Sequence, residues 1–339
     1  MDGWNWRALL IGFTGALILL GVLFFVVGAK PILESLTSAD PALVAMTLAF
    51  VLAWLGAWGL LFRTVLETLG IGLPIRMSFF AYASAAFANN VTPFGQAGGE
   101  LLTAGLISKV ADARYETGLA GIATVDVLNV VSSLVLIFVG VGYYATTAII
   151  GERLETAVGS AVALVVVLGT SMILIWRYQE SITDRIAVGV GKIADWLPGK
   201  TADPDAVAEN VAQRLRRFFD RIGQMATQRR QLAIAFGFSL LGWLFQTIAL
   251  LTAFAAIGSS VPIYIALFVI PLGNLAGATP LPGGLGGVEA AFVALLVPTT
   301  GIPAATVTAA VLIYRGLVYW LPVVIGGGSV VVFGTRTVA

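Results

Sequence analysis

The chain alternates between long uncharged apolar runs and short polar segments. The runs Ala8 to Ala29 and Ala42 to Phe62 contain no Asp, Glu, Lys or Arg over more than 20 residues. A helix needs roughly 20 apolar residues to cross about 30 Å of hydrocarbon. The strands of a transmembrane barrel would instead show short alternating segments. The pattern therefore predicts membrane-spanning helices.

Six runs are long enough to cross a bilayer as single helices. They are residues 7–29, 41–62, 116–148, 157–176, 231–256 and 304–328. Two further apolar regions are interrupted, 75–109 by Asn89-Asn90-Val91-Thr92-Pro93 and 263–298 by Thr279-Pro280-Leu281-Pro282-Gly283-Gly284. Pro and Gly free backbone groups that lipid cannot satisfy, so each region is predicted to be a re-entrant hairpin or a pair of short tilted helices. We expect an all-α polytopic membrane bundle forming one transmembrane domain over 1–339.

The two interruptions resemble one another. Both read Thr-Pro, a Gly-rich turn, Gly-Gly and a lone Glu that opens an apolar helix, over 92–100 and again over 279–289. Each follows a long span, and the two preceding spans are expected to cross in opposite directions. Matched broken helices in inverted repeats are typical of transporters. We therefore predict inverted units over about 41–148 and 231–328, whose exposed helix N-termini favour anions.

Basic residues near the ends of the spans predict the orientation. The segment 177–230 holds ten of the 19 Lys and Arg residues, which indicates that it is cytoplasmic. Counting outward from it puts both termini in the cytoplasm and the segments 30–40, 149–156 and 257–262 outside. We therefore expect a multi-pass protein of the cell membrane.

The cytoplasmic segment is itself patterned as helices. Asp203-Pro204 is typical of a helix start, and apolar residues recur at helical spacing from Val207 to Ile222, flanked by arginines. A weaker apolar stripe runs from Ile182 to Leu197. These helices either lie on the inner leaflet, where basic residues meet anionic lipid, or pack on the protein's own cytoplasmic face.

Composition narrows the chemistry. The chain is 58% hydrophobic and 11% charged, its formal net charge is +1, and it contains no Cys and no His. Disulfides, thiolate or imidazole metal sites, cysteine nucleophiles and histidine bases are therefore excluded. No Walker motif occurs, so ATP is not expected to drive the protein directly. We expect no cofactor, no bound metal and no nucleic-acid partner.

Few ionisable residues fall at membrane depth, where they are costly and usually functional. Glu100 and Glu289 open the helices after the two breaks, Asp126 lies in the span 116–148, and Arg315 lies in the span 304–328. Arg315 could pair with any of the three carboxylates. One interpretation is a structural ion pair that locks the bundle. The other is that Arg315 binds a phosphate, for which its planar guanidinium is suited.

A family resemblance rests on the second break and the last span. The stretch P-L-P-G-G-L-G-G-V-E from Pro280 to Glu289, with Leu312-Ile313-Tyr314-Arg315, Tyr319-Trp320-Leu321-Pro322 and Gly326 to Gly328, resembles the lysylphosphatidylglycerol synthase transmembrane region. The stretch from Asn89 to Glu100 is similar to that family's first broken segment. The resemblance covers about residues 7–333.

The resemblance implies lipid handling. In aminoacyl-phosphatidylglycerol synthases this flippase-like domain is associated with moving a charged phospholipid across the bilayer, and other members accompany glycosyltransferases that use polyprenyl-phosphate carriers. Those synthases carry a soluble aminoacyl-transferase domain, which we do not expect here. The resemblance implies that the substrate is bound by Thr92, Pro93, Gly98, Gly99, Glu100, Pro282, Gly283, Gly284, Gly286, Glu289, Tyr314 and Arg315. Asp126 is added to these candidates because it is expected to lie at membrane depth.

Three functions follow from these observations. The first is a flippase-like transporter that moves an anionic phospholipid or a polyprenyl-phosphate-linked lipid between leaflets, without catalysis. The second is a membrane-embedded enzyme that acts on a lipid phosphate with paired carboxylates. The third is a non-catalytic membrane partner of a glycosyltransferase.

Overall fold

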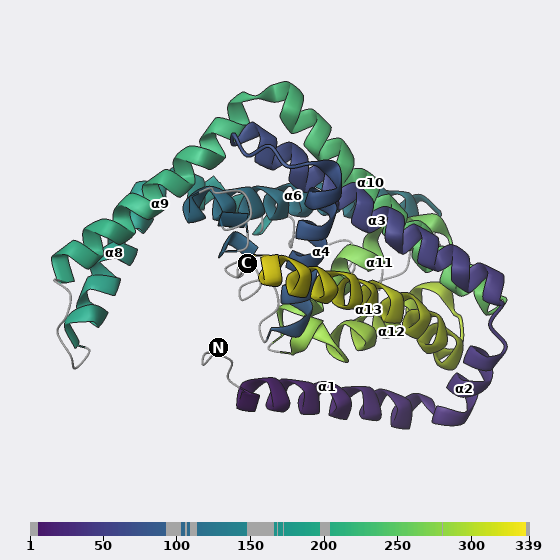
Figure 1. The fold of residues 1–339 in the computed structure, drawn as a ribbon. Coiled ribbons are helices and arrows are strands. Elements are labelled where there is room, and N and C mark those ends of the chain that lie inside the picture. The colour runs from purple at the N-terminus through teal and green to yellow at the C-terminus, as the bar shows by residue number, and fades with distance from the viewer. Residues whose placement is uncertain are drawn as a thin grey trace.

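The computed structural model describes residues 6–92, 103–105, 107–108, 114–147, 166–167, 169–171, 173–196, 204–279 and 281–336. This part of the chain is helical and contains no strand. The elements, shown in Figure 1, are α1 (Trp6–Val27), α2 (Ala29–Thr37), α3 (Pro41–Thr68), α4 (Ile75–Val91), α6 (Tyr115–Thr147), α8 (Gln179–Trp196), α9 (Pro204–Thr227), α10 (Arg229–Ala256), α11 (Ile263–Leu275), η1 (Ala276–Ala278), η2 (Pro282–Gly284), α12 (Gly287–Thr300) and α13 (Ala304–Arg336).

The predicted all-α polytopic membrane bundle is confirmed. Within the described residues, five helices are long and apolar enough to cross a membrane, and α1 with α2 makes a sixth if the bent pair is one span. The five are α3, α6, α10, α13 and the segment Pro282–Thr300, which the sequence analysis assigned to a broken region. The predicted span 157–176 lies largely outside the described residues.

The N-terminal segment differs from the predicted span over 7–29 followed by a loop over 30–40. The chain bends by 93° between α1 and α2, and residues 29–37 are helical. Gly28 allows this bend because it adopts a φ of +99°, which other residues rarely reach. Ile32, on α2, is fully buried, and α2 packs against α13. Residues 29–37 are therefore a helix rather than the expected loop, because Ile32 is buried and α2 packs against α13.

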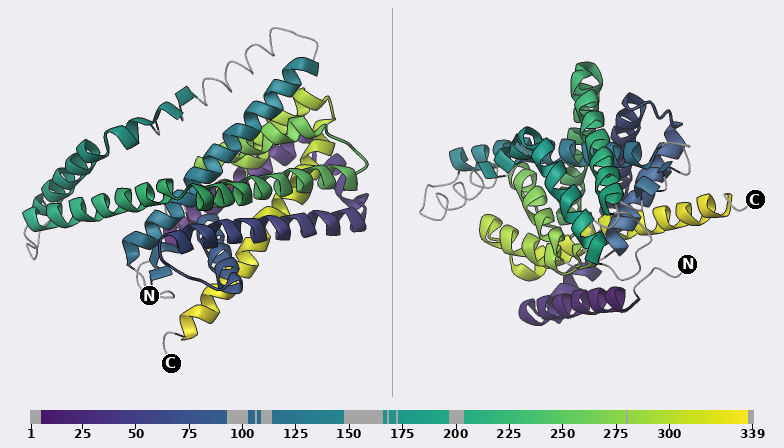
Figure 2. Two further views of the ribbon diagram at one scale, coloured as in Figure 1. Left: turned by 90° about the horizontal axis from the view of Figure 1, so that it is seen from above. Right: turned by 90° about the vertical axis from the view of Figure 1, so that its left-hand side faces the viewer.

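The centre of the bundle is the antiparallel pair α3 and α10, which run side by side in Figure 2. The Asp40 amide at the start of α3 donates to the Ala256 carbonyl at the end of α10, at 2.7 Å. Farther along, Thr47 Oγ1 donates to Thr252 Oγ1 at 3.0 Å, and Trp58 Nε1 donates to the Ser239 carbonyl at 3.2 Å. These contacts run from the start of α3 to Trp58 and from the end of α10 back to Ser239.

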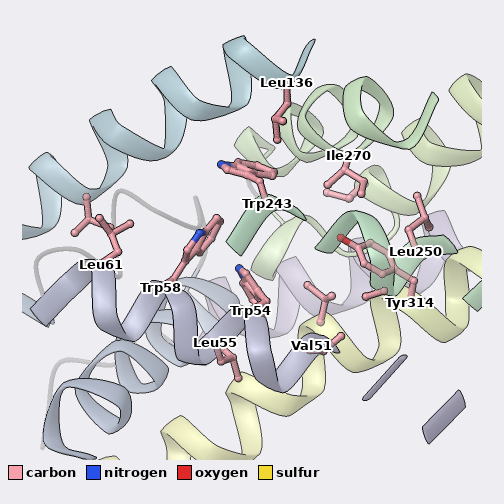
Figure 3. Close-up of a cluster of buried hydrophobic side chains, with 14 of the residues drawn as sticks. Val51, Trp54, Leu55, Trp58, Leu61, Leu136, Trp243, Leu250, Ile270 and Tyr314 are labelled. Atoms are coloured by element: carbon pink, nitrogen blue, oxygen red, sulfur yellow. The ribbon is translucent and has the colours of Figure 1, made fainter. Parts of the chain in front are cut away.

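An aromatic cluster fills the space around this pair. Trp58 makes edge-on contacts with Trp54 and Trp243, with ring centroids 5.3 and 5.4 Å apart. Figure 3 shows Trp54 and Trp58 of α3 close to Trp243 of α10, with Leu136 of α6 near Trp243. Trp243 Nε1 donates to the Asn129 carbonyl of α6 at 3.1 Å, so its polar edge is satisfied inside the core.

The remaining spans pack in an exchanged pattern around the pair. α4 packs most extensively on α13, and α11 packs most extensively on α6. Each contact therefore joins one predicted repeat unit to the other. A two-fold relation between inverted units would produce this exchange. The repeat itself remains a hypothesis.

The segment 177–230, predicted to be cytoplasmic, forms the predicted helices. α8 and α9 pack against each other and extend away from the bundle (Figure 1). α9 begins at Pro204 and also contacts α6, where Arg214 Nε lies 3.6 Å from Glu116 Oε1. Phe218 of the α9 stripe packs against the core cluster. These contacts favour packing on the protein's own face for the part of α9 beside α6.

Candidate functional site

The second break is a compact turn between α11 and α12. Three glycines in it have positive φ angles: Gly283 at +55°, Gly284 at +67° and Gly286 at +82°. The turn is also crowded, because an added Cβ would lie 2.5 Å from the Tyr319 ring at Gly283 and 2.7 Å from Leu19 at Gly286. Glycine is therefore required at these positions for both its backbone freedom and its size.

Glu289 closes the N-terminus of α12. Its Oε2 accepts a hydrogen bond of 2.6 Å from the Gly286 amide, the reach-back half of a capping box. The sequence predicts an anion site at this helix start, and a carboxylate of the same helix already lies there. Glu289 is 2% exposed, so its charge is held almost entirely away from water.

Arg315 of α13 faces this carboxylate. Its Nε donates to Glu289 Oε1 at 3.0 Å, and its Nη2 donates to the Gly283 carbonyl at 3.1 Å. Of the three carboxylates that the sequence offered as partners, the ion pair forms with Glu289. The guanidinium thus joins α13 to the turn and to the following helix at one point.

The Arg315 guanidinium has N–H donors that these two bonds do not use. An arginine has five N–H donors, and Arg315 uses two of them in the bonds to Glu289 and Gly283. Among the described residues Nη1 has no hydrogen-bond partner, and it is not one of the described polar atoms that are both fully buried and unpaired. The protein therefore occupies one edge of this nearly buried cation, through Nε and Nη2.

Two tyrosines of α13 have different surroundings. Tyr314 is fully buried in the core drawn in Figure 3, and its hydroxyl donates to Gln246 Oε1 of α10 at 2.9 Å. Tyr319 lies at the break, where its ring packs on Gly283 and its hydroxyl donates to the Asn90 carbonyl at 3.1 Å. Tyr314 thus joins α13 to α10, and Tyr319 is the tyrosine that contacts the turn.

The end of α4, which leads into the first break, meets the second break here. Asn90 Nδ2 donates to the Tyr319 carbonyl at 3.0 Å, and the Asn90 Cα would lie 3.2 Å from a Cβ on Gly283. Thr92 ends α4 as its C-cap residue. Pro93, Gly98, Gly99 and Glu100, the other site residues predicted in the first break, lie outside the described residues.

The remaining predicted residues divide between this site and another region. Pro282 is buried at the start of η2, next to Gly283. Asp126 interacts electrostatically with Tyr82 of α4 and makes no ion pair with Arg315. Tyr82 in turn contacts Trp58 edge-on, so Asp126 belongs to the surroundings of the aromatic cluster.

Sequence reasoning left Asn90, Tyr319 and Gln246 out of the site. Asn90 and Tyr319 were quoted as part of the motifs, but a hydrogen bond between positions 229 residues apart has no local signal. Gln246 is an amide in the middle of an apolar span, and such amides are usually hydrogen-bonded. That rule predicts that Gln246 is hydrogen-bonded, but it does not identify Tyr314 as the partner.

The helical spans and the interrupted segments define a polytopic α-helical membrane protein with an ion pair at a broken helix. The profile of the lysylphosphatidylglycerol synthase TM region matches residues 9–326, and the chain belongs to this family. The predicted resemblance is thus confirmed.

Similar proteins cover nearly the whole chain. A UPF0104 membrane protein of Methanothermobacter thermautotrophicus is 28% identical over 338 residues, which is 98% of this chain and 95% of that protein. A second UPF0104 membrane protein of the same organism is 23% identical, with 94% and 93% covered. A UPF0104 membrane protein of Pyrococcus horikoshii is 22% identical, with 94% of each chain covered.

Proposed function

We propose that the protein is a flippase-like transporter that moves an anionic phospholipid or a polyprenyl-phosphate-linked lipid between leaflets. The observation that carries this proposal is Arg315, a cation in a long apolar helix that bonds two of its five N–H donors to the described part of the chain. A guanidinium matches the geometry of phosphate oxygens. The family name, which refers to synthesis of a phospholipid, supports a lipid as the ligand.

The surroundings of Arg315 suit a ligand whose tails stay in the bilayer. α1 borders the break, since a Cβ on Gly15 would lie 3.2 Å from Leu281 and one on Gly286 would lie 3.1 Å from the Ala16 carbonyl. Beyond these contacts α1 is exposed, and Phe25 and Val26 are 89% and 75% accessible. A lipid could therefore reach the break from the hydrocarbon phase beside α1.

Purified protein in liposomes tests the proposal. Fluorescently labelled phosphatidylglycerol is expected to move between leaflets faster than in protein-free liposomes, and labelled phosphatidylcholine, which has no net charge, is expected to move less. Extraction and chromatography of the lipid would reveal any chemical change. Converted lipid would favour the enzyme, and neither movement nor conversion would favour the partner of a glycosyltransferase.

The proposed orientation is tested separately with introduced cysteines, because the chain contains none. Ser181 in α8 and Ser260 before α11 are both exposed. In intact cells, an impermeant maleimide is expected to label Ser260→Cys and to label Ser181→Cys only after lysis. The reverse pattern would place α8 outside and contradict cytoplasmic termini.

A further inference from the structure

The ion pair at the second break is electrically balanced. Arg315 and Glu289 carry opposite unit charges, and their side chains are 8% and 3% exposed. The titratable neighbours from the described elements around them are Tyr319 and Tyr314, both on α13. α1 faces the turn with Gly15, Ala16 and Leu19, and α11 packs on α12 through Gly273 against Phe292. These elements bring no further charge to the pair.

An anionic ligand upsets this balance. A phosphodiester that binds the Arg315 guanidinium adds one negative charge to a buried pair whose sum is zero. Net charge at this depth is unfavourable because little water remains to solvate it. The site regains neutrality if one of its groups takes up a proton. Arginine is already protonated and a phosphodiester is a weak base, so the carboxylate of Glu289 is the group that can accept it.

We propose that binding of the phosphate-bearing lipid is coupled to uptake of one proton by Glu289, so that lipid and proton cross the membrane together. This inference rests on the proposed function. The proton comes from water and bonds to Oε1, the oxygen that Arg315 Nε releases as it turns toward the phosphate. Oε2 keeps its bond from the Gly286 amide, so the start of α12 stays capped in both states. Departure of the lipid restores the ion pair and returns the proton to water.

Proton uptake is measured at equilibrium, without transport. Short-chain phosphatidylglycerol is added to detergent-solubilised protein in weakly buffered solution with a pH indicator, and bound lipid is counted in parallel with a radiolabel. Phosphatidylglycerol is suitable because its phosphodiester does not titrate near neutral pH, unlike a phosphate monoester with a second pKa of about 6. We expect uptake of up to one proton per bound lipid. Lipid binding without proton uptake at any pH between about 5 and 8 would overturn the coupling and leave the proposed function standing.

The results that would contradict the proposed lipid transport differ from those that would contradict the proton coupling. If phosphatidylglycerol neither binds nor moves between leaflets, both proposals fall together. If it binds and moves while the indicator reports no proton, only the coupling falls. The wild-type measurement decides between these outcomes, so the test does not depend on the folding of a variant.

Variants assign the proton to a residue. Glu289→Gln keeps the size of the side chain and cannot take up a proton, so lipid binding to this variant is expected to occur with no proton uptake. Glu67→Gln is the control, because Glu67 pairs with Arg63 on a more exposed part of α3. It should show the wild-type proton count. Uptake that persists in Glu289→Gln would assign the proton elsewhere and contradict the proposal.

Liposomes show the coupling as a pH dependence. With equal pH on both sides, the apparent affinity for phosphatidylglycerol should rise as the pH falls, by at most about tenfold per pH unit, the limit for one proton. Glu289→Gln should show no such slope. A wild-type affinity that is constant over the same range, with proton uptake absent, would refute the coupling.

Discussion

Replacing Arg315 with alanine is expected to reduce leaflet exchange of labelled phosphatidylglycerol by about one to two orders of magnitude. Hydrogen bonds to a charged group contribute about 1.5–3 kcal/mol, and each 1.4 kcal/mol is a factor of ten. Arg315→Lys keeps the charge and loses the planar fork that reaches both Glu289 and Gly283, so its exchange should fall between alanine and wild type. The measurement is exchange normalised to folded protein in liposomes.

The controls for this prediction separate binding from folding. Arg217→Ala removes an exposed arginine of α9 that bonds only its neighbour Gln213, and it should exchange lipid at the wild-type rate. Arg315→Ala also leaves Glu289 buried without its cation, which costs about 3–5 kcal/mol where one partner of a buried pair is removed. Its thermal stability must therefore be measured beside its activity.

A double substitution distinguishes a binding residue from a structural one. Changing both Arg315 and Glu289 to leucine removes both buried charges, and such replacements are often neutral or stabilising. We expect the double variant to fold and to lack exchange of anionic lipid. Normal exchange by this variant would mean that the ion pair only supports the fold, and the proposal of a phosphate site at Arg315 would have to be abandoned.

Gly326→Ala is expected to destabilise the protein by about 1–3 kcal/mol or more, the range for overpacked interiors. A Cβ at this position would lie 2.1 Å from the Ala83 carbonyl oxygen and 2.7 Å from Phe87 Cβ on α4. The nearest obstacle is backbone, which cannot rotate away as a side chain can. The two helices must therefore separate, which would lengthen the 3.0 Å bond from Asn90 to Tyr319.

The same glycine run provides the matched control. Gly328 has no atom within 4 Å of its added Cβ and lies in the same helix. Gly328→Ala should be neutral or slightly stabilising, because alanine is preferred to glycine in helices by about 1 kcal/mol. Thermal unfolding in one detergent compares the two variants. Equal melting temperatures would show that α4 and α13 are not packed through Gly326.

The sequence was sufficient to predict the class of fold. Bilayer thickness fixes the length of an apolar helix, so uncharged runs such as Ala42 to Phe62 identify spans without knowledge of their neighbours. Backbone chemistry likewise identifies the interruption before α12, since Pro282 and the glycines after it cannot continue a regular helix. The positions of Arg315 and Glu289 within apolar segments likewise predict that both lie at membrane depth.

The partners within the site were decided only by the tertiary structure. Tyr314 and Arg315 are adjacent in sequence, but successive residues of a helix point about 100° apart, so one faces α10 and the other faces α12. Which carboxylate meets Arg315, and which tyrosine meets Gly283, depends on how α13 is rotated and shifted against its neighbours. That register is set by close packing, such as the contact of Gly326 with Ala83, between residues too far apart in sequence to leave a local pattern.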